Sequence, residues 1–153
     1  MILEYYSMPH AKHKPVRANP SDAGLDLKYN PDVGSQPVSI EPGQSMILGT
    51  GLKFGVPHGY MIQIMNRSGN AAKKKLMVGA CVVDSGYNGE VFVNLHNIGS
   101  KPQTINPGDK IAQAVVIPIV PARFLETNRD NLYDWSPITI SGRGDGALGS
   151  TGD

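Results

Sequence analysis

Residues 78–97 read Val-Gly-Ala-Cys-Val-Val-Asp-Ser-Gly-Tyr-Asn-Gly-Glu-Val-Phe-Val-Asn-Leu-His-Asn. Two β-rich runs, Ala80–Val83 and Val91–Leu95, flank a centre that contains Ser85-Gly86 and Asn88-Gly89. Gly and Asn tolerate positive φ, so this centre is typical of a tight turn. The pattern predicts a β-hairpin whose edge offers backbone N–H and C=O groups to a flat polar ligand.

Two side chains of this stretch could carry chemistry. Asp84 stands where the first run ends, and Tyr87 stands near the tip of the loop. A carboxylate beside a ligand pocket can take a proton from water. A turn-capping Asp on a solvent-facing hairpin is the simpler alternative, and this stretch alone leaves both open.

The composition predicts one turn-rich β domain. The chain has 153 residues, with 18 Gly and 12 Pro, which is too many for a helical protein. Its net charge of +1 gives no electrostatic reason to expect nucleic acid or a membrane as a partner. The single Cys fits a reducing compartment, and no signal peptide or membrane-spanning run is recognisable, so we expect a cytoplasmic protein.

Short apolar runs between Pro and Gly turns predict a sandwich or barrel of short strands. The predicted strands before the opening stretch are Ile2–Tyr6, Leu25–Leu27, Pro37–Ile40, Ser45–Leu48, Leu52–Val56 and Tyr60–Met65. Ile111–Pro118 is apolar on both faces, which predicts a central strand. Its one polar residue, Gln113, must be hydrogen-bonded to a ligand or to backbone.

The run Ser21–Leu27 combines small residues with one acid. Alternation would point Leu25 and Leu27 to one face and Asp26 to the other. An Asp among small residues can serve a turn or a reaction, and the run itself supports both readings equally.

Arg67–Lys75 is the best helix candidate in the chain. Ser68 can cap it, alanines favour it, and lysines fall near its C-terminal end. An N-terminus with Arg67, the Ser68 hydroxyl and free N–H groups would suit phosphate, whereas an ordinary capped surface turn is the alternative.

From Ser141 the chain is rich in glycine. Its composition predicts a mobile segment, and Arg143, Ser150 and Thr151 are residue types that bind phosphate. One interpretation is an arm that becomes ordered over a bound nucleotide. A disordered terminus is the other.

Five stretches, in this order, resemble the motifs of the trimeric dUTP pyrophosphatase (dUTPase) family. They are Ala23-Gly24-Leu25-Asp26-Leu27, Arg67-Ser68-Gly69, Val83-Asp84-Ser85-Gly86-Tyr87-Asn88-Gly89, Gly108-Asp109-Lys110-Ile111-Ala112-Gln113, and Arg143-Gly144 through Gly149-Ser150-Thr151-Gly152. Each motif alone is weak, whereas five in sequence over residues 23–152 are specific.

The resemblance implies an all-β subunit, a distorted β-barrel or jelly roll of the β-clip type, with one short helix and a flexible Gly-rich tail. It implies one domain over residues 1–140 and a mobile arm over residues 141–153. It further implies a homotrimer with shared active sites, and Mg²⁺-assisted hydrolysis of dUTP to dUMP and pyrophosphate. The metal would be held by substrate phosphates and water, with no direct protein ligand.

The resemblance also implies roles for individual residues. Asp84 would hold and deprotonate the attacking water, Asp26 would act through water around the metal, and Tyr87 would lie under the deoxyribose and exclude a 2′-hydroxyl. Uracil would pair with backbone of the hairpin, around Cys81, Val82, Val83 and Phe92.

The remaining implied contacts are to the phosphates and to the face of the base. The phosphates would be held by Arg67, Ser68, Gly69 and Gln113. The arm of a neighbouring subunit would close the site with Arg143, Leu148, Gly149, Ser150 and Thr151.

Three features depart from the family's pattern. Cys81 replaces a Gly three residues before the catalytic Asp, and Ala147-Leu148 replaces a Gly-Phe pair. The Phe stacks on uracil in the family, so the resemblance implies that Leu148 can cover the base only as an aliphatic lid. The segment between Gln113 and Arg143 is longer than usual.

Two other functions are compatible with such a chain. A dCTP deaminase shares the fold but carries a catalytic Glu on the strand after the hairpin, where this chain has Asn94. A nucleotide-binding regulator without turnover would keep the site and signal to a partner protein.

Overall fold

The computed structural model describes residues 1–135, and the chain divides into two units, Met1–Pro121 and Ala122–Asp153. The first unit carries eleven strands and one helical turn, η1 (Asn70–Lys74). The strands are β1 (Tyr5–Ser7), β2 (Leu25–Lys28), β3 (Val38–Ile40), β4 (Ser45–Gly49), β5 (Leu52–Phe54), β6 (Tyr60–Met65), β7 (Leu76–Val78), β8 (Val82–Val83), β9 (Phe92–Asn97), β10 (Gln103–Ile105) and β11 (Lys110–Pro118).

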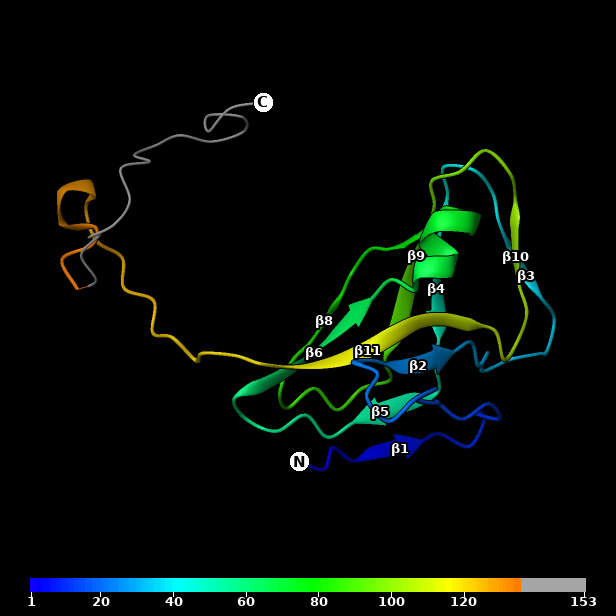
Figure 1. Cartoon of the computed structure of the whole chain (residues 1–153), viewed down its shortest axis with the longest axis horizontal. Coiled ribbons are helices and arrows are strands. Elements are labelled where there is room, and N and C mark those ends of the chain that lie inside the picture. The colour runs from blue at the N-terminus through cyan, green and yellow to red at the C-terminus, as the bar shows by residue number, and fades with distance from the viewer. Residues whose placement is uncertain (136–153) are drawn as a thin grey trace. The chain divides into compact units, whose positions relative to one another are not determined.

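The strands form antiparallel sheets whose neighbours are far apart in sequence (Figure 1). The largest has the order β2-β11-β6-β8, and a second has the order β4-β9-β7. Two further pairs are β1 with β5 and β3 with β10. The predicted all-β, jelly-roll-like fold is confirmed, although the sheets of the described part do not close into a barrel.

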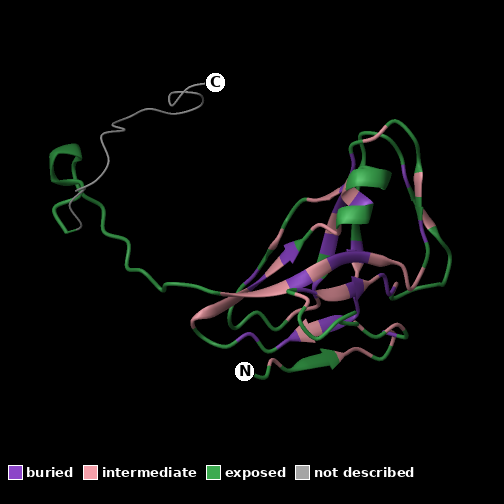
Figure 2. Cartoon of the chain, viewed as in Figure 1, coloured by how far each residue is buried: buried purple, intermediate pink, exposed green. Residues whose placement is uncertain are grey.

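One hydrophobic core draws on both larger sheets. Its best buried side chains include Leu27, Ile62 and Ile111 from the four-stranded sheet, together with Leu48 and Leu95 from the three-stranded sheet. Figure 2 shows these strands lined with buried residues, whereas the segment after β11 is exposed. Successive side chains of a strand point to opposite faces of the sheet, so each strand contributes every second side chain to this core.

β11 is a central strand, as its apolar sequence predicted. It pairs with β2 on one side and with β6 on the other. Gln113 lies opposite Asp26 in one pairing and opposite Met65 in the other. The strand therefore brings the ends of β2 and β6 to the same part of the sheet.

The predicted hairpin between Ala80–Val83 and Val91–Leu95 is wrong. β8 pairs with β6, whereas β9 pairs with β4 and β7 in another sheet. The turn signal between them was correct, because the Asp84 carbonyl accepts a hydrogen bond from the Tyr87 N–H at 3.2 Å. The turn reverses the chain locally, but burial of the apolar face of β9 decides its partners.

The predicted short helix is a single π-helical turn, and Ser68 does not cap it. The capping position is Gly69, and no side chain makes a cap hydrogen bond there. Instead the Asn70 amide donates to the Lys110 carbonyl at 3.0 Å, which ties the start of η1 to β11. Lys73 and Lys74 do fall in its last turn, as expected, and Lys75 ends it with a φ of 56°.

The second unit is described as far as residue 135 and is exposed there. It contains a 3₁₀ turn, η2 (Arg129–Asn131), where the Asn128 side chain accepts a hydrogen bond from the Asn131 N–H. The predicted arm over residues 141–153 lies outside the described residues. Residues 1–135 contain no helix long and apolar enough to cross a membrane.

Candidate active site

A pocket of about 230 Å³ opens beside β8 and the turn that follows it. It brings together most of the residues expected to contact the base and the attacking water. It is lined by Ile64, Ala80, Cys81, Val82, Val83, Asp84, Tyr87, Glu90, Val91 and Phe92. Val82, Tyr87 and Phe92 are each about half exposed, which leaves apolar surface free for a flat ligand.

The backbone of this pocket presents a free edge. β8 is the last strand of its sheet and pairs on one side with β6, through Ile62 opposite Val83 and Gln63 opposite Val82. The Cys81 carbonyl is also used on that side, because it accepts a hydrogen bond from the Ile64 N–H at 2.7 Å. The other edge of β8 has no strand partner in the described part of the chain, so its backbone groups can meet a ligand.

Asp84 stands at the rim of the pocket on an exposed turn. Gly86 in this turn has a φ of 85°, a conformation that side-chain-bearing residues rarely adopt. The Ser85 hydroxyl donates to the Val56 carbonyl at 3.0 Å and anchors the turn to the chain after β5. Within residues 1–135 the Asp84 carboxylate makes no hydrogen bond or ion pair, so both its oxygens can accept hydrogen bonds from water or ligand.

Tyr87 is fixed by its own loop. Its hydroxyl donates to the Glu90 carbonyl at 2.8 Å, and a Cβ on Gly89 would collide with the phenol. Glu90 is itself held, because one carboxylate oxygen accepts a hydrogen bond from the Gly51 N–H at 2.7 Å. No role for Glu90 was predicted from the sequence, because an acid next to a Gly-rich turn does not indicate contacts with Gly51 and Tyr87.

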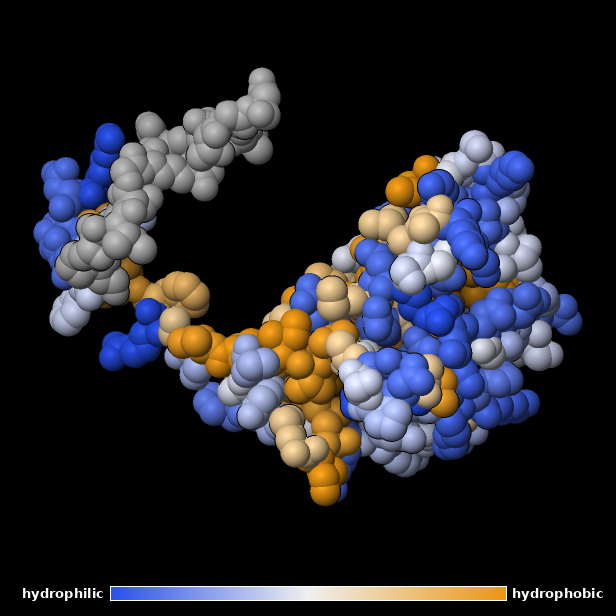
Figure 3. All heavy atoms as spheres, in the orientation of Figure 1, coloured by the Kyte–Doolittle hydropathy of each residue, from blue (hydrophilic) through white to orange (hydrophobic). Residues whose placement is uncertain are grey.

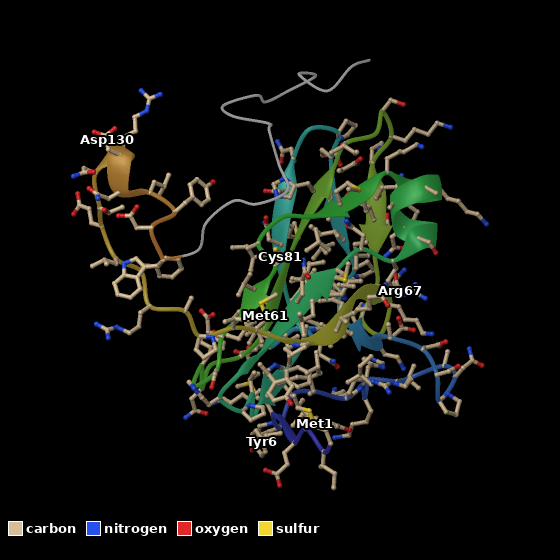
Figure 4. The ribbon with its side chains drawn as sticks, turned by 60° about the vertical axis from the view of Figure 1, so that its left-hand side comes forward. Met1, Tyr6, Met61, Arg67, Cys81 and Asp130 are labelled. Carbon is tan, nitrogen blue, oxygen red and sulfur yellow. The ribbon has the colours of Figure 1, made fainter. Side chains whose placement is uncertain are left out.

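A second group of residues lies on β2, on β11 and in the segment that follows β6. We call Asp26, Arg67 and Lys110 the charge cluster. The Arg67 Nε donates to one carboxylate oxygen of Asp26 at 2.8 Å, and the Lys110 Nζ lies 2.8 Å from the other. Figure 4 places Arg67 close to the helical turn η1, and the Asp26 backbone pairs with Val16 as well as with β11.

The surroundings of Asp26 lower the pKa of its carboxyl. Burial alone raises that pKa, but hydrogen bonds from Lys110 and Arg67, with the charges of both, outweigh burial. The side chain is 14% exposed and stays ionised between two cations. Lys110 belongs to the motif Gly108–Gln113, but no role was predicted for it from the sequence. A single Lys at the start of an otherwise apolar strand was the signal that could have pointed to its contact with Asp26.

Gln113 connects β11 to the segment that follows β6. Its side-chain amide nitrogen donates to the Asn66 carbonyl at 2.9 Å, which confirms that this polar residue is hydrogen-bonded; of the two expected partners, ligand or backbone, this one is backbone. Its side chain lies directly over Gly24, where an added Cβ would overlap the amide oxygen. Close packing against Gln113, and not a special backbone angle, therefore favours glycine at position 24.

The structure does not bring all the predicted site residues together in one chain. Asp26, Arg67, Ser68 and Gln113 do not line the β8 pocket. Ser68 and Gly69 are exposed where the helical turn begins. Five predicted residues lie outside the described part of the chain, namely Arg143, Leu148, Gly149, Ser150 and Thr151.

The donor set fits a magnesium ion carried by the ligand better than one caged by protein. Among the described residues no three His, Cys, Asp or Glu side chains gather in a metal-binding group. Both oxygens of Asp26 already contact cations, which would compete with direct coordination of a metal ion. Mg²⁺ commonly keeps several waters and binds through substrate phosphates.

Asn94 occupies the position where a dCTP deaminase would carry its catalytic acid. Its side-chain oxygen lies 2.6 Å from the His96 Nε2, and both side chains sit where a Cβ on Gly79 would clash. A neutral amide held in this way supplies no carboxylate.

Comparisons with known proteins agree with this geometry. The sequence model of the dUTPase family matches residues 10–150. The deoxyuridine 5'-triphosphate nucleotidohydrolase of Chlamydia muridarum is 36% identical over 141 residues, which cover 91% of this chain and 90% of the relative. The Chlamydia caviae protein of the same name is 35% identical over the same shares.

Solved structures show the same fold. A variant of Staphylococcus bacteriophage 80alpha dUTPase, solved with dUpNHpp, superposes with a TM-score of 0.82 at 22% identity and covers 99% of both chains. A variant dUTPase from Staphylococcus aureus phage phi11, which coordinates a structural Mg(II) ion, has a TM-score of 0.75 at 22% identity. It covers 86% of this chain and 99% of its own.

Proposed function

The chain belongs to the dUTPase family, and we propose that the β8 pocket and the charge cluster are the two parts of its catalytic site. The enzyme hydrolyses dUTP to dUMP and pyrophosphate. This reaction keeps uracil out of DNA and supplies dUMP for thymidylate synthesis.

Asp84 is the proposed general base, and its position carries the proposal. Its carboxylate stands at the pocket rim and is unpaired among the described residues, so it can orient a water and accept its proton. The water oxygen then bonds to the α-phosphorus, the bond from that phosphorus to the bridging oxygen breaks, and pyrophosphate leaves. Such a reaction depends on positioning and charge stabilisation more than on covalent catalysis.

The pocket supplies the proposed recognition of base and sugar. Uracil would pair with the free backbone edge of Cys81, Val82 and Val83, with Phe92 beside it. The Tyr87 ring would pack on deoxyribose, and its fixed hydroxyl keeps the ring where a 2′-hydroxyl would have to fit. A 2′-hydroxyl placed there would lose its hydrogen bonds, so UTP is disfavoured.

The phosphates are the proposed ligands of Arg67, Ser68, Gly69 and Gln113. Arg67 offers charge, whereas Ser68 and Gly69 offer a hydroxyl and exposed backbone where the helical turn begins. Asp26 would hold water around a Mg²⁺ ion that arrives with the nucleotide. When bound, this ion would neutralise charge on the phosphate oxygens. Arg143, Leu148, Gly149, Ser150 and Thr151 are proposed to close over the bound nucleotide.

A homotrimer with shared sites is the proposed assembly. It is supported by the lining of the β8 pocket, which includes none of the three charge-cluster residues, because two subunits could complete each other's sites. Apolar surface supports it too. A groove of about 370 Å³ is lined in part by Met1, Leu25, Phe54 and Val116, and Figure 3 shows apolar atoms gathered over the N-terminus and the far end of β11.

A pyrophosphate-release assay with Mg²⁺ on dUTP, dCTP, UTP and dTTP tests the function. We expect release from dUTP far above the other three nucleotides. Ammonia release from dCTP would instead support the deaminase, and tight dUTP binding without any release would support a regulator.

A cytoplasmic location also stays a prediction, resting on the single cysteine.

A further inference from the structure

Lys110 is the member of the charge cluster without a role in the proposed reaction. Its side chain is 34% exposed, and its Nζ contacts the carboxylate oxygen of Asp26 that Arg67 leaves free. The two cations therefore divide one carboxylate between them, one oxygen each.

This division is unusual for arginine. A guanidinium prefers to meet a carboxylate as a fork, with two parallel N–H···O bonds to both oxygens. Here Arg67 uses its Nε alone, and within residues 1–135 its terminal nitrogens make no hydrogen bond. The Lys110 ammonium contacts the oxygen that the second bond of the fork would use, so it competes with Arg67 for that oxygen.

We infer that Lys110 is a positioning residue, which keeps Arg67 in single-point contact with Asp26 so that the terminal nitrogens of Arg67 stay available to the substrate's phosphates. The inference rests on the proposed function, because it takes Arg67 as a phosphate ligand. Without the ammonium, Arg67 would turn its fork onto Asp26, and a phosphate would have to compete for it.

The surrounding structure holds Lys110 where this role requires it. Its backbone carbonyl accepts from the buried Asn70 amide at 3.0 Å, three residues beyond Arg67 in the chain. Lys28 lies opposite Lys110 in the pairing of β2 with β11. The lysine thus begins a strand anchored both to the segment that carries Arg67 and to the strand that carries Asp26.

Lys110→Met tests the inference, because Met keeps the apolar stem and removes the charge. Binding of a non-hydrolysable dUTP analogue should weaken about tenfold, as expected for one lost charge-assisted hydrogen bond. Binding of deoxyuridine, which has no phosphate, should stay unchanged in an NMR titration. Lys110→Arg should bind the analogue more tightly than Lys110→Met, since it restores a cation beside Asp26.

Lys28→Met is the matched control, because it removes a lysine from the paired strand without touching Asp26. Its affinities should equal those of the parent chain. A melting curve verifies that each variant folds, and Lys110→Gln takes the place of Lys110→Met if the latter does not.

Two results would overturn the inference. Unchanged affinity for the analogue would show that Arg67 needs no help from Lys110. An equal loss for the analogue and for deoxyuridine would show that Lys110 supports the fold and not the phosphate contact. Failure of the parent chain to hydrolyse dUTP refutes the proposed function instead, and it is measured before any variant is made.

Discussion

Replacing Gly24 by Ala should disturb the site through packing alone. The added Cβ would overlap the Gln113 amide oxygen, and it would lie 2.9 Å from the amide carbon and 3.0 Å from the Cβ of the same residue. Gln113 must then move and weaken its hydrogen bond to the Asn66 carbonyl. The substitution therefore first affects the hydrogen bond that connects β11 to the segment carrying Arg67.

The expected loss of stability can be estimated from these contacts. Overpacking typically costs about 1–3 kcal/mol, and a weakened hydrogen bond about 1 kcal/mol. Ala restricts the unfolded chain more than Gly, which returns roughly 0.4–1 kcal/mol. We therefore expect Gly24→Ala to lower the free energy of unfolding by about 2 kcal/mol and to raise KM for dUTP more than it lowers kcat.

Urea unfolding at one fixed protein concentration measures the first effect, since assembly makes stability depend on concentration. Gly69→Ala is the matched control for stability, because Gly69 has a φ of −65° and an added Cβ there meets no atom within 4 Å. Its unfolding free energy should differ from that of the parent chain by less than about 0.5 kcal/mol. If Gly24→Ala unfolds at the same urea concentration as the control and keeps its KM, the close packing of Gln113 is not what requires glycine.

Four further predictions concern the reaction, its selectivity, the charge cluster and the assembly. Asp84→Asn should abolish pyrophosphate release but bind the dUTP analogue normally, because the amide keeps the shape and loses the base; near-normal kcat would disprove the role. Tyr87→Ala should lower the dUTP/UTP ratio of kcat/KM, and an unchanged ratio would show that the ring does not exclude the 2′-hydroxyl. The folded-state pKa of Asp26 is lowered, so its stabilisation is complete above the unfolded pKa of about 3.9 and is lost as pH falls through the folded pKa. Urea midpoints of the parent chain and Asp26→Asn should therefore converge on acidification, and a constant gap would contradict the ion pairs. Light scattering should give three chains per particle, whereas a fully active monomer would exclude shared sites.

The sequence predicted best where a strand pattern and its burial were unambiguous. The apolar run Ile111–Pro118 predicted that β11 is central, and its one polar residue, Gln113, is hydrogen-bonded as expected. The alternation around Asp26 correctly separated the acid from the buried Leu27. Side-chain alternation is local, so it can be read without knowing which strands pair.

Predictions failed where the partner lay elsewhere in the chain. The turn at Asp84 looked like a hairpin, but β8 and β9 belong to different sheets, because pairing is decided by which face is buried. Ser68 looked like a cap, but the helical turn is anchored by Asn70 to the Lys110 carbonyl. The contact of Lys110 with Asp26 also depends on the pairing of β2 with β11, which no local pattern specifies.

The same pairing of β2 with β11 has a consequence for how the chain folds. Almost every strand of the first unit pairs with a strand that is distant in sequence. Such topologies fold slowly, because the chain loses loop-closure entropy before the long-range contacts that stabilise the fold can form. β11 is the last strand of this unit to be synthesised, and it lies between β2 and β6 in the largest sheet. A nascent chain that has not yet released β11 from the ribosome therefore exposes unpaired edges of β2 and β6. The charge cluster also forms only when β11 joins the sheet, so its assembly and the protection of these edges from aggregation come in the same late step.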